Sequence, residues 1–95
     1  MITVYTQPGC VPCKLTAAIL LDGGFEHHVV DVTKDPEGMA YLKRIGATSV
    51  PVVKIDGELP IIGFHPDLLK ERLRDRLDIK PTAIHDYVYE GEDDE

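Results

Sequence analysis

The chain alternates between strand-type and helix-type apolar patterns, and this order constrains its fold more than any other feature. Glycine, proline and aspartate breakers separate runs rich in β-branched residues from stretches with helical spacing of apolar side chains. The predicted strands are 2–6, 25–32, 50–55 and 58–62, and the predicted helices are 11–21, the stretch from Pro36 to Gly46, and the stretch that begins at Pro66. The order β-α-β-α-β-β-α predicts a single α/β domain.

The connections between these elements predict how the strands pair. A strand, a helix and a second strand imply a parallel pair with a right-handed crossover. Asp56-Gly57 between the last two strands predicts a tight hairpin turn. Pro60 lacks an N–H, so the returning strand is placed at the edge of the sheet. We therefore expect a four-stranded mixed sheet with helices on both faces.

Two of the predicted helices show a regular spacing of apolar side chains. In the first helix the spaced positions are Val11, Leu15, Ala18, Ile19 and Leu21. In the third helix they are Leu69, Leu73 and Leu77. Because side chains three or four positions apart lie on one face of a helix, Leu69, Leu73 and Leu77 form the predicted buried stripe of the third helix, and the spacing in the first supports its assignment as a helix.

Two cysteines, Cys10 and Cys13, stand at the junction between the first strand and the first helix. The start of a helix has unpaired backbone N–H groups and the positive end of the helix dipole, so it stabilises a thiolate. Sites in open α/β sheets also gather at the carboxyl ends of strands, where this pair is predicted to lie. The pair is therefore a candidate catalytic dithiol with a redox-active Cys10–Cys13 disulfide.

A metal site is the alternative interpretation of the same pair, because Cys-x-x-Cys supplies half of a tetrahedral zinc site. The histidines that could complete such a site are His27, His28, His65 and His85. They are scattered along the chain without ligand spacing, and the adjacent His27 and His28 would point to opposite faces of a strand. The chain has no second cysteine pair, so we expect no bound metal or other cofactor.

The formal net charge of −7 belongs to the C-terminal end of the chain. Up to Lys80 there are 11 acidic and 10 basic residues, and the other six acidic residues lie between Asp86 and Glu95. A nearly neutral body gives no electrostatic basis for binding nucleic acid. We expect one domain over residues 1–80 and an acidic, flexible tail over residues 81–95.

Composition is that of a soluble globular protein. Its residues are 43% hydrophobic and 28% charged, and no apolar run approaches the roughly 20 residues that cross a bilayer. The chain starts in a strand pattern without a signal-type segment, so we expect a cytoplasmic monomer that does not bind membranes. Another class of function stays open, namely a non-enzymatic adaptor that binds its partner through Tyr87 and Tyr89 in the acidic tail.

Three segments together resemble the thioredoxin fold and, within it, the NrdH-redoxin branch of the glutaredoxin-like proteins. They are Tyr5-Thr6-x-Pro8-x-Cys10-x-x-Cys13, Val50-Pro51-Val52 and Gly63-Phe64-x-Pro66-Asp67. The resemblance spans residues 1–78 and implies a cis Val50–Pro51 peptide bond packed beside the catalytic cysteines. The predicted substrate-binding residues around the cysteines are Val11, Pro12, Val50, Pro51, Gly63, Phe64, His65 and Asp67.

The chain departs from this branch at Gln7, Pro12 and Ile61-Ile62, where the branch has Lys, Gln and Trp-Ser. Glutathione-dependent glutaredoxins hold the glutathione carboxylate with backbone N–H groups of a Gly-Gly-x-Asp-Asp segment. Phe64 crowds that position here and Pro66 removes an N–H. We therefore expect glutathione to bind poorly, although Asp67 still matches and a glutathione-dependent glutaredoxin stays an alternative.

The resemblance implies a protein disulfide reductase. The Cys10 thiolate would attack a disulfide in a partner protein, and Cys13 would resolve the mixed disulfide. The backbone of Val50 would pair with an extended segment of the partner, as in strand addition. By resemblance, thioredoxin reductase would return electrons from NADPH, and the acceptor would be a ribonucleotide reductase or another disulfide protein.

Overall fold

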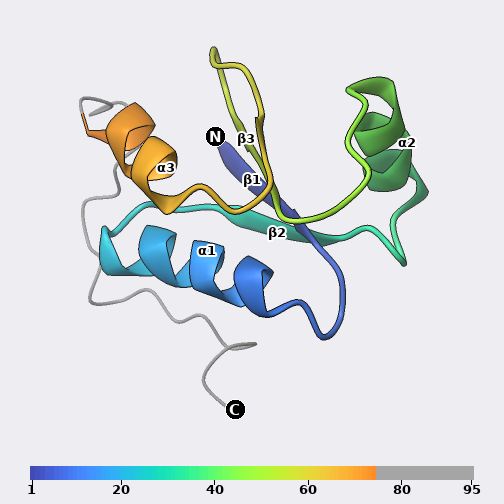
Figure 1. Cartoon of the computed structure of the whole chain (residues 1–95), viewed down its shortest axis with the longest axis horizontal. Helices are drawn as coiled ribbons and strands as arrows, with labels where there is room; N and C mark the ends of the chain where they lie inside the picture. Colours follow the sequence, from blue (N-terminus) through green and yellow to red (C-terminus); the bar gives the residue numbers. More distant parts are fainter. Residues whose placement is uncertain (75–95) are drawn as a thin grey trace.

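The computed structural model describes residues 1–74, and within them the helices and strands follow the predicted order (Figure 1). The strands are β1 (Ile2–Thr6), β2 (His28–Asp31), β3 (Val52–Ile55) and β4 (Ile61–Ile62). The helices are α1 (Val11–Asp22), α2 (Pro36–Arg44) and α3 (Pro66–Leu73). The predicted α/β class and the order β-α-β-α-β-β-α are confirmed.

Three strands are shorter than predicted, and β3 begins only at Val52, after the Val50–Pro51 bond. After α1, the N–H of Phe25 donates to the carbonyl oxygen of Leu20 at 2.9 Å, so the chain is still bonded to the end of the helix and β2 begins only at His28. In the hairpin, the N–H of Glu58 donates to Ile55 within the turn at 2.9 Å. Pro60 has no N–H to donate to the neighbouring strand, so β4 begins only after it and contains two residues.

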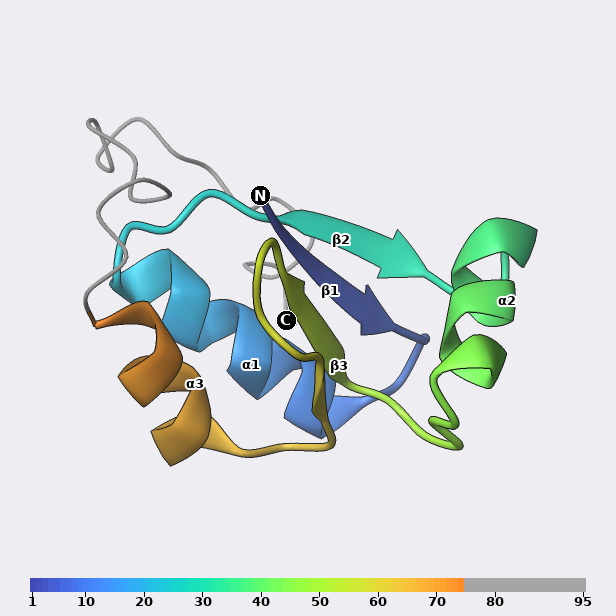
Figure 2. The same cartoon turned by 90° about the horizontal axis from the view of Figure 1, so that it is seen from above.

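The strands form one mixed sheet in the order β2-β1-β3-β4. β1 and β2 run parallel, and β3 runs antiparallel to both β1 and β4. Figure 2 shows β1 and β2 side by side, pointing the same way. The turn between β3 and β4 lies at the predicted Asp56-Gly57, and β4 lies at the sheet edge that Pro60 predicts.

The helices pack on both faces of the sheet, with α1 and α2 on opposite sides of it in Figure 1. The buried cluster shared with α1 and α3 contains Ile2, Val4, Leu20, Val53, Ile55, Ile61, Leu69 and Leu73. The cluster shared with α2 contains Tyr5, Val32, Leu42, Ala47 and Val52. Neighbouring residues of β1 therefore face different helices, because side chains alternate along a strand.

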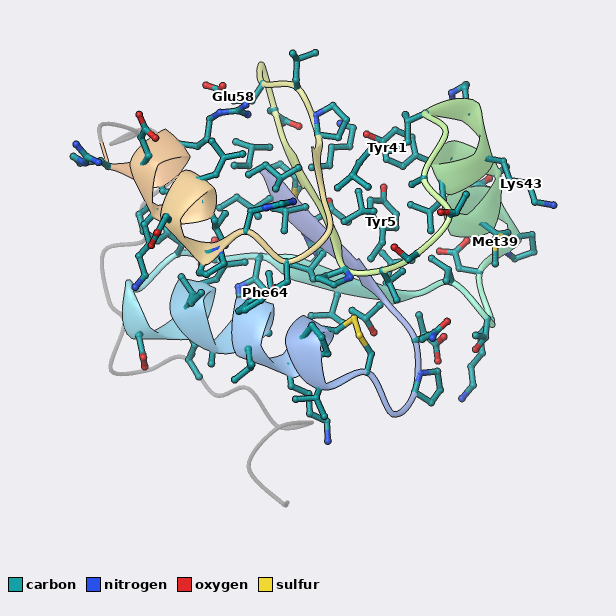
Figure 3. The ribbon with its side chains drawn as sticks, viewed as in Figure 1. Tyr5, Met39, Tyr41, Lys43, Glu58 and Phe64 are labelled. Atoms are coloured by element: carbon teal, nitrogen blue, oxygen red, sulfur yellow. A yellow bond between two sulfur atoms is a disulfide. The ribbon has the colours of Figure 1, made fainter. Side chains whose placement is uncertain are left out.

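An aromatic pair joins α2 to the sheet. The ring of Tyr5 in β1 stacks on the ring of Tyr41 in α2, with 5.1 Å between centroids (Figure 3). The guanidinium carbon of Arg44 lies 5.3 Å from the centroid of Tyr41. Gly38 lets α2 approach closely, since a Cβ at this position would lie 2.9 Å from Cγ1 of Val30.

The helix predicted from the apolar spacing over residues 11–21 is present as α1. The buried residues of this helix are Cys13, Thr16, Ala17 and Leu20. Val11 and Leu15 are instead 62% and 49% exposed, and Ala18 is exposed beside them. Apolar residues surround most of this helix, so their spacing does not identify the face that turns to the sheet. In α3 the prediction is right for Leu69 and Leu73, which are both buried.

Several expectations fall outside the described residues. They concern Leu77, the domain boundary at residue 80 and the tail over residues 81–95. Within residues 1–74, no helix has the length and apolar character needed to span a membrane.

Candidate functional site

Cys10 and Cys13 lie at the N-terminus of α1 and are joined by a disulfide bond, drawn in yellow in Figure 3. Cys10 is the N-cap residue, and its Sγ accepts a hydrogen bond from the N–H of Cys13 at 3.2 Å. Cys13 is inside the helix and 3% exposed, whereas Cys10 is half-buried. The two sulfurs therefore differ in access to solvent, and the outer one belongs to Cys10.

The first turn of α1 favours negative charge on Cys10 once the disulfide is reduced. It carries no acidic residue, and its one charged side chain is that of Lys14. The positive end of the helix dipole acts in the same direction. Pro12 lies in the first turn of α1, where backbone N–H groups make no hydrogen bond within the helix, so the lack of an N–H in proline costs nothing there. The site thus combines an accessible sulfur with surroundings that stabilise a thiolate.

The Val50–Pro51 peptide bond is cis, as the resemblance implies. Tyr5 is the register partner of Val52, so this bond lies beside the end of β1 from which the chain runs to Cys10. Pro51 is buried and Val50 is half-buried. Among the described residues, none makes a backbone hydrogen bond with the N–H or C=O of Val50. These groups are available to an extended segment of another molecule.

A hydrogen bond ties the loop before α3 to the cis peptide. The N–H of Gly63 donates to the carbonyl oxygen of Pro51 at 2.8 Å. Phe64 follows and is 38% exposed, on the loop that leads into α3 and above α1 in the view of Figure 3. His65 is the N-cap residue of α3 but makes no capping hydrogen bond with its side chain, and Asp67 lies exposed in the first turn.

A small open pocket of about 180 Å³ reaches the disulfide from the side of β2. Its polar lining residues include Gln7, Lys14 and Asp31. Asp31 accepts hydrogen bonds from the hydroxyl of Thr33 at 2.6 Å and from the N–H of Thr33 at 2.9 Å. These bonds hold the pKa of Asp31 below its ordinary value, so the carboxylate is charged at neutral pH.

Sequence reasoning missed Asp31, although a signal was present. The carboxyl ends of parallel neighbouring strands meet at one edge of a sheet. Asp31 is the last residue of β2 and the register partner of Thr6, the last residue of β1. The first polar residue at the end of the second strand could therefore have been placed beside the cysteine loop.

The three histidines in the described part of the chain do not gather around the cysteines as a zinc site requires. Within residues 1–74, no group of three or more His, Cys, Asp or Glu side chains is arranged to hold a metal ion. His27 is buried, and its Nδ1 lies 2.9 Å from the carbonyl oxygen of Phe25. His28 and His65 are exposed, and His85 is outside the described residues.

Comparison with known proteins places this site in a family. The Glutaredoxin family profile matches residues 2–59, which contain both cysteines and the cis peptide bond. The chain belongs to the glutaredoxin family. Its Cys10–Cys13 disulfide is accordingly the active-site disulfide of a glutaredoxin-family redox protein.

Individual relatives agree with this assignment. The chain is 46% identical over 71 residues to the gene 56 protein of Mycobacterium phage D29, a match covering 74% of this chain and 79% of the relative. It is 37% identical over 68 residues to the glutaredoxin-like protein NrdH of Escherichia coli K12, covering 72% of this chain and 83% of the relative.

Solved structures show the same fold. The glutaredoxin-like protein NrdH-redoxin from Escherichia coli superposes with a TM-score of 0.67 at 36% identity, covering 74% of this chain and 91% of that chain. The crystal structure of the thioredoxin-like protein BC3987 superposes with a TM-score of 0.69 at 35% identity, covering 75% of this chain and 97% of that chain. The fold is thioredoxin-like, as the sequence resemblance implies.

Proposed function

We propose that this glutaredoxin-family protein is a thiol–disulfide oxidoreductase that reduces disulfide bonds in other proteins. The observation that carries the proposal is the position of Cys10, which is the N-cap of α1 and the more accessible sulfur of a disulfide with Cys13. A positive helix end next to an accessible sulfur suits a nucleophilic thiolate. The buried Cys13 suits the resolving role.

The reaction takes place in two exchanges. The Cys10 thiolate attacks one sulfur of the partner's disulfide, which forms a Cys10–partner disulfide and releases the other partner sulfur as a thiolate. Cys13, after losing its proton, attacks Sγ of Cys10 and releases the second partner sulfur as a thiolate. The partner gains two electrons, the Cys10–Cys13 disulfide forms, and protons from solvent convert the released thiolates to thiols.

The residues around the disulfide support binding of a protein segment. The open N–H and C=O of Val50 suit an extended backbone, as in strand addition. The exposed side chains of Val11, Pro12 and Phe64 add apolar surface on either side of Val50. The 2.8 Å hydrogen bond between Gly63 and Pro51 holds these two halves of the proposed binding surface together. His65 and Asp67 complete it at the start of α3.

Thioredoxin reductase, using NADPH, is the proposed electron source, and ribonucleotide reductase is the proposed acceptor, both in the cytoplasm. The similarity to NrdH supports this choice, because the Escherichia coli NrdH-redoxin is a glutaredoxin-like protein with a thioredoxin-like activity profile. The thioredoxin-like activity would extend to this chain with its cysteine pair and its Gly63-Phe64-x-Pro66-Asp67 segment.

Glutathione is the competing electron source. Against it, Pro66 at the start of α3 has no N–H to bind a carboxylate, and Phe64 occupies the preceding loop. Gln7, which lines the pocket beside the disulfide, is uncharged and offers no ion pair. We therefore propose that glutathione is a poor reductant of this disulfide.

Insulin reduction tests the electron source directly. The assay follows NADPH consumption with insulin as the disulfide substrate, and compares thioredoxin reductase with glutathione plus glutathione reductase. We expect turnover with thioredoxin reductase and little with glutathione, and none for Cys10→Ser with either. Faster turnover with glutathione would indicate a glutathione-dependent glutaredoxin. No turnover with either electron source would contradict the proposed function.

A further inference from the structure

Two side chains of opposite charge line the open pocket that reaches the disulfide. Lys14 comes from the first turn of α1, and Asp31 comes from the end of β2. Apart from these two and the cysteines, the lining in the described part of the chain has no ionisable side chain and consists of Thr6, Gln7, Pro8, Gly9, Ala17 and Val29. The sulfurs therefore face one cation and one anion on this side of the site.

The Asp31 carboxylate is held by its own turn. Its Oδ1 accepts a 2.6 Å hydrogen bond from the hydroxyl of Thr33 and a 2.9 Å hydrogen bond from the N–H of Thr33. These bonds, with a smaller contribution from the charge of Lys34, hold the pKa of Asp31 below its ordinary value. Asp31 is also the register partner of Thr6, from which the chain runs to Cys10. A carboxylate that is charged at neutral pH is thus anchored beside the cysteine loop.

Lys14 and Asp31 do not cancel each other through a direct contact. Among residues 1–74, neither side chain takes part in an ion pair with the other. Lys14 is exposed on α1, and the hydrogen bonds of the Asp31 carboxylate come from Thr33. Each charge therefore acts on the sulfurs independently, and removal of one leaves the other in place.

These charges act on the two redox states unequally. A reduced pair with Cys10 as the thiolate carries a negative charge that the disulfide lacks. A nearby carboxylate disfavours this thiolate, whereas a nearby ammonium and the positive end of α1 favour it. Whatever destabilises the reduced form makes the dithiol a stronger reductant. Because the pocket is open, water screens both charges, and each effect is limited to a few-fold.

We propose that Asp31 and Lys14 set the reduction potential of the Cys10–Cys13 disulfide in opposite directions, with Asp31 making the dithiol the stronger reductant. Both are positioning residues, because they act through the charge on Cys10 and take no part in the bond exchange. This role rests on the proposed function, since a protein that reduces other disulfides must give up electrons more readily than the thiols of its acceptor do. Asp31 thus favours electron transfer to a partner, and Lys14 favours formation of the nucleophilic thiolate.

Equilibration with dithiothreitol measures this potential without insulin. Reduced dithiothreitol closes its own disulfide and passes two electrons to Cys10–Cys13, and mass spectrometry after rapid thiol alkylation gives the ratio of dithiol to disulfide protein. We expect Asp31→Asn to raise the equilibrium constant for reduction of the protein about threefold, which corresponds to about 14 mV, and Lys14→Gln to lower it about threefold. The double variant should return close to the unmodified chain, and both shifts should shrink at high salt.

Thr33→Val is the matched control, because it removes the 2.6 Å hydrogen bond and keeps the charge of Asp31. We expect its equilibrium constant to equal that of the unmodified chain. An unchanged constant in either charge variant, shifts of the same sign, or an equal shift in Thr33→Val would overturn the proposal. Lys14 is exposed on α1, so Lys14→Gln tests it even where Asp31→Asn folds poorly. Absence of insulin reduction by the unmodified chain, with the expected shifts in place, would instead count against the proposed function alone.

Discussion

The N–H of Gly63 donates a 2.8 Å hydrogen bond to the carbonyl oxygen of Pro51, so the loop that carries Phe64 is fixed to the cis peptide bond. Gly63 has a φ of 93°, which residues with a Cβ rarely adopt. A Cβ there would also lie 3.3 Å from Nε2 of His65. The geometry of the proposed substrate surface thus depends on a glycine at this position.

Gly63→Ala should destabilise the fold by about 1–2 kcal/mol, because alanine would be strained at this φ. It should also lower kcat/KM for insulin reduction while leaving the alkylation rate of Cys10 unchanged. Gly46→Ala is the matched control, since Gly46 has a φ of 80° but follows α2. We expect that control to lose stability and keep its activity at temperatures where it is folded. Equal losses of activity in both variants would mean that the loop does not contact substrate.

Reduced Cys10 should alkylate about tenfold or more faster than Cys13 at neutral pH. Cys10 is half-buried at the helix start, whereas Cys13 is 3% exposed. Mass spectrometry of peptides after brief iodoacetamide treatment measures both sites in one sample, with Cys10→Ser giving the rate of Cys13 alone. Comparable slow rates at both cysteines would contradict the assignment of Cys10 as nucleophile.

Gly38→Ala tests the close contact between α2 and the sheet. Alanine gains up to about 1 kcal/mol of helix propensity over glycine. Its Cβ would lie 2.9 Å from Cγ1 of Val30, however, and overpacking typically costs about 1–3 kcal/mol. We expect net destabilisation in urea unfolding, and recovery when Val30→Ala is added to remove the clashing methyl group. A stabilised single variant would show that the helix moves away at little cost.

Stability should fall as the pH drops through the titration of His27. Burial, the largest cause, lowers the pKa of His27 below its ordinary 6.5, and charge repulsion from His28 acts the same way. The unfolded state then binds more protons, so the unfolding free energy decreases from about pH 6.5 down to the lower pKa of the folded state. His27→Gln should remove this slope and His28→Gln should retain most of it. Asp31 affects stability only at more acidic pH, since its lowered pKa lies below 3.8.

A structural feature can be predicted from the sequence when the residues that cause it are close together in the chain. Asp56-Gly57 produces a turn through its own backbone preferences, and Cys10-x-x-Cys13 places its sulfurs together within one helical turn. Both were predicted correctly. Pro51 is different, because few X-Pro bonds are cis and only the resemblance to a family indicated this one.

The sequence is less informative where tertiary packing decides. In α1, the spacing of Val11 and Leu15 indicates a helix but not which face is buried, and Cys13 and Leu20 face the core. Periodicity reports a face only when the other face is polar, and this helix has apolar residues on both. No single segment places Asp31 beside the cysteines, and its position follows only when the carboxyl ends of the parallel strands β1 and β2 are considered together.

Trapping the mixed disulfide tests the central claim most directly. Reduced Cys13→Ser and Cys10→Ser variants are each mixed with a disulfide-containing protein such as insulin and analysed by non-reducing mass spectrometry. If Cys10 attacks and Cys13 resolves, Cys13→Ser accumulates a covalent adduct that dithiothreitol releases, and Cys10→Ser forms little. Adducts of equal yield, or an adduct formed mainly by Cys10→Ser, would contradict the account.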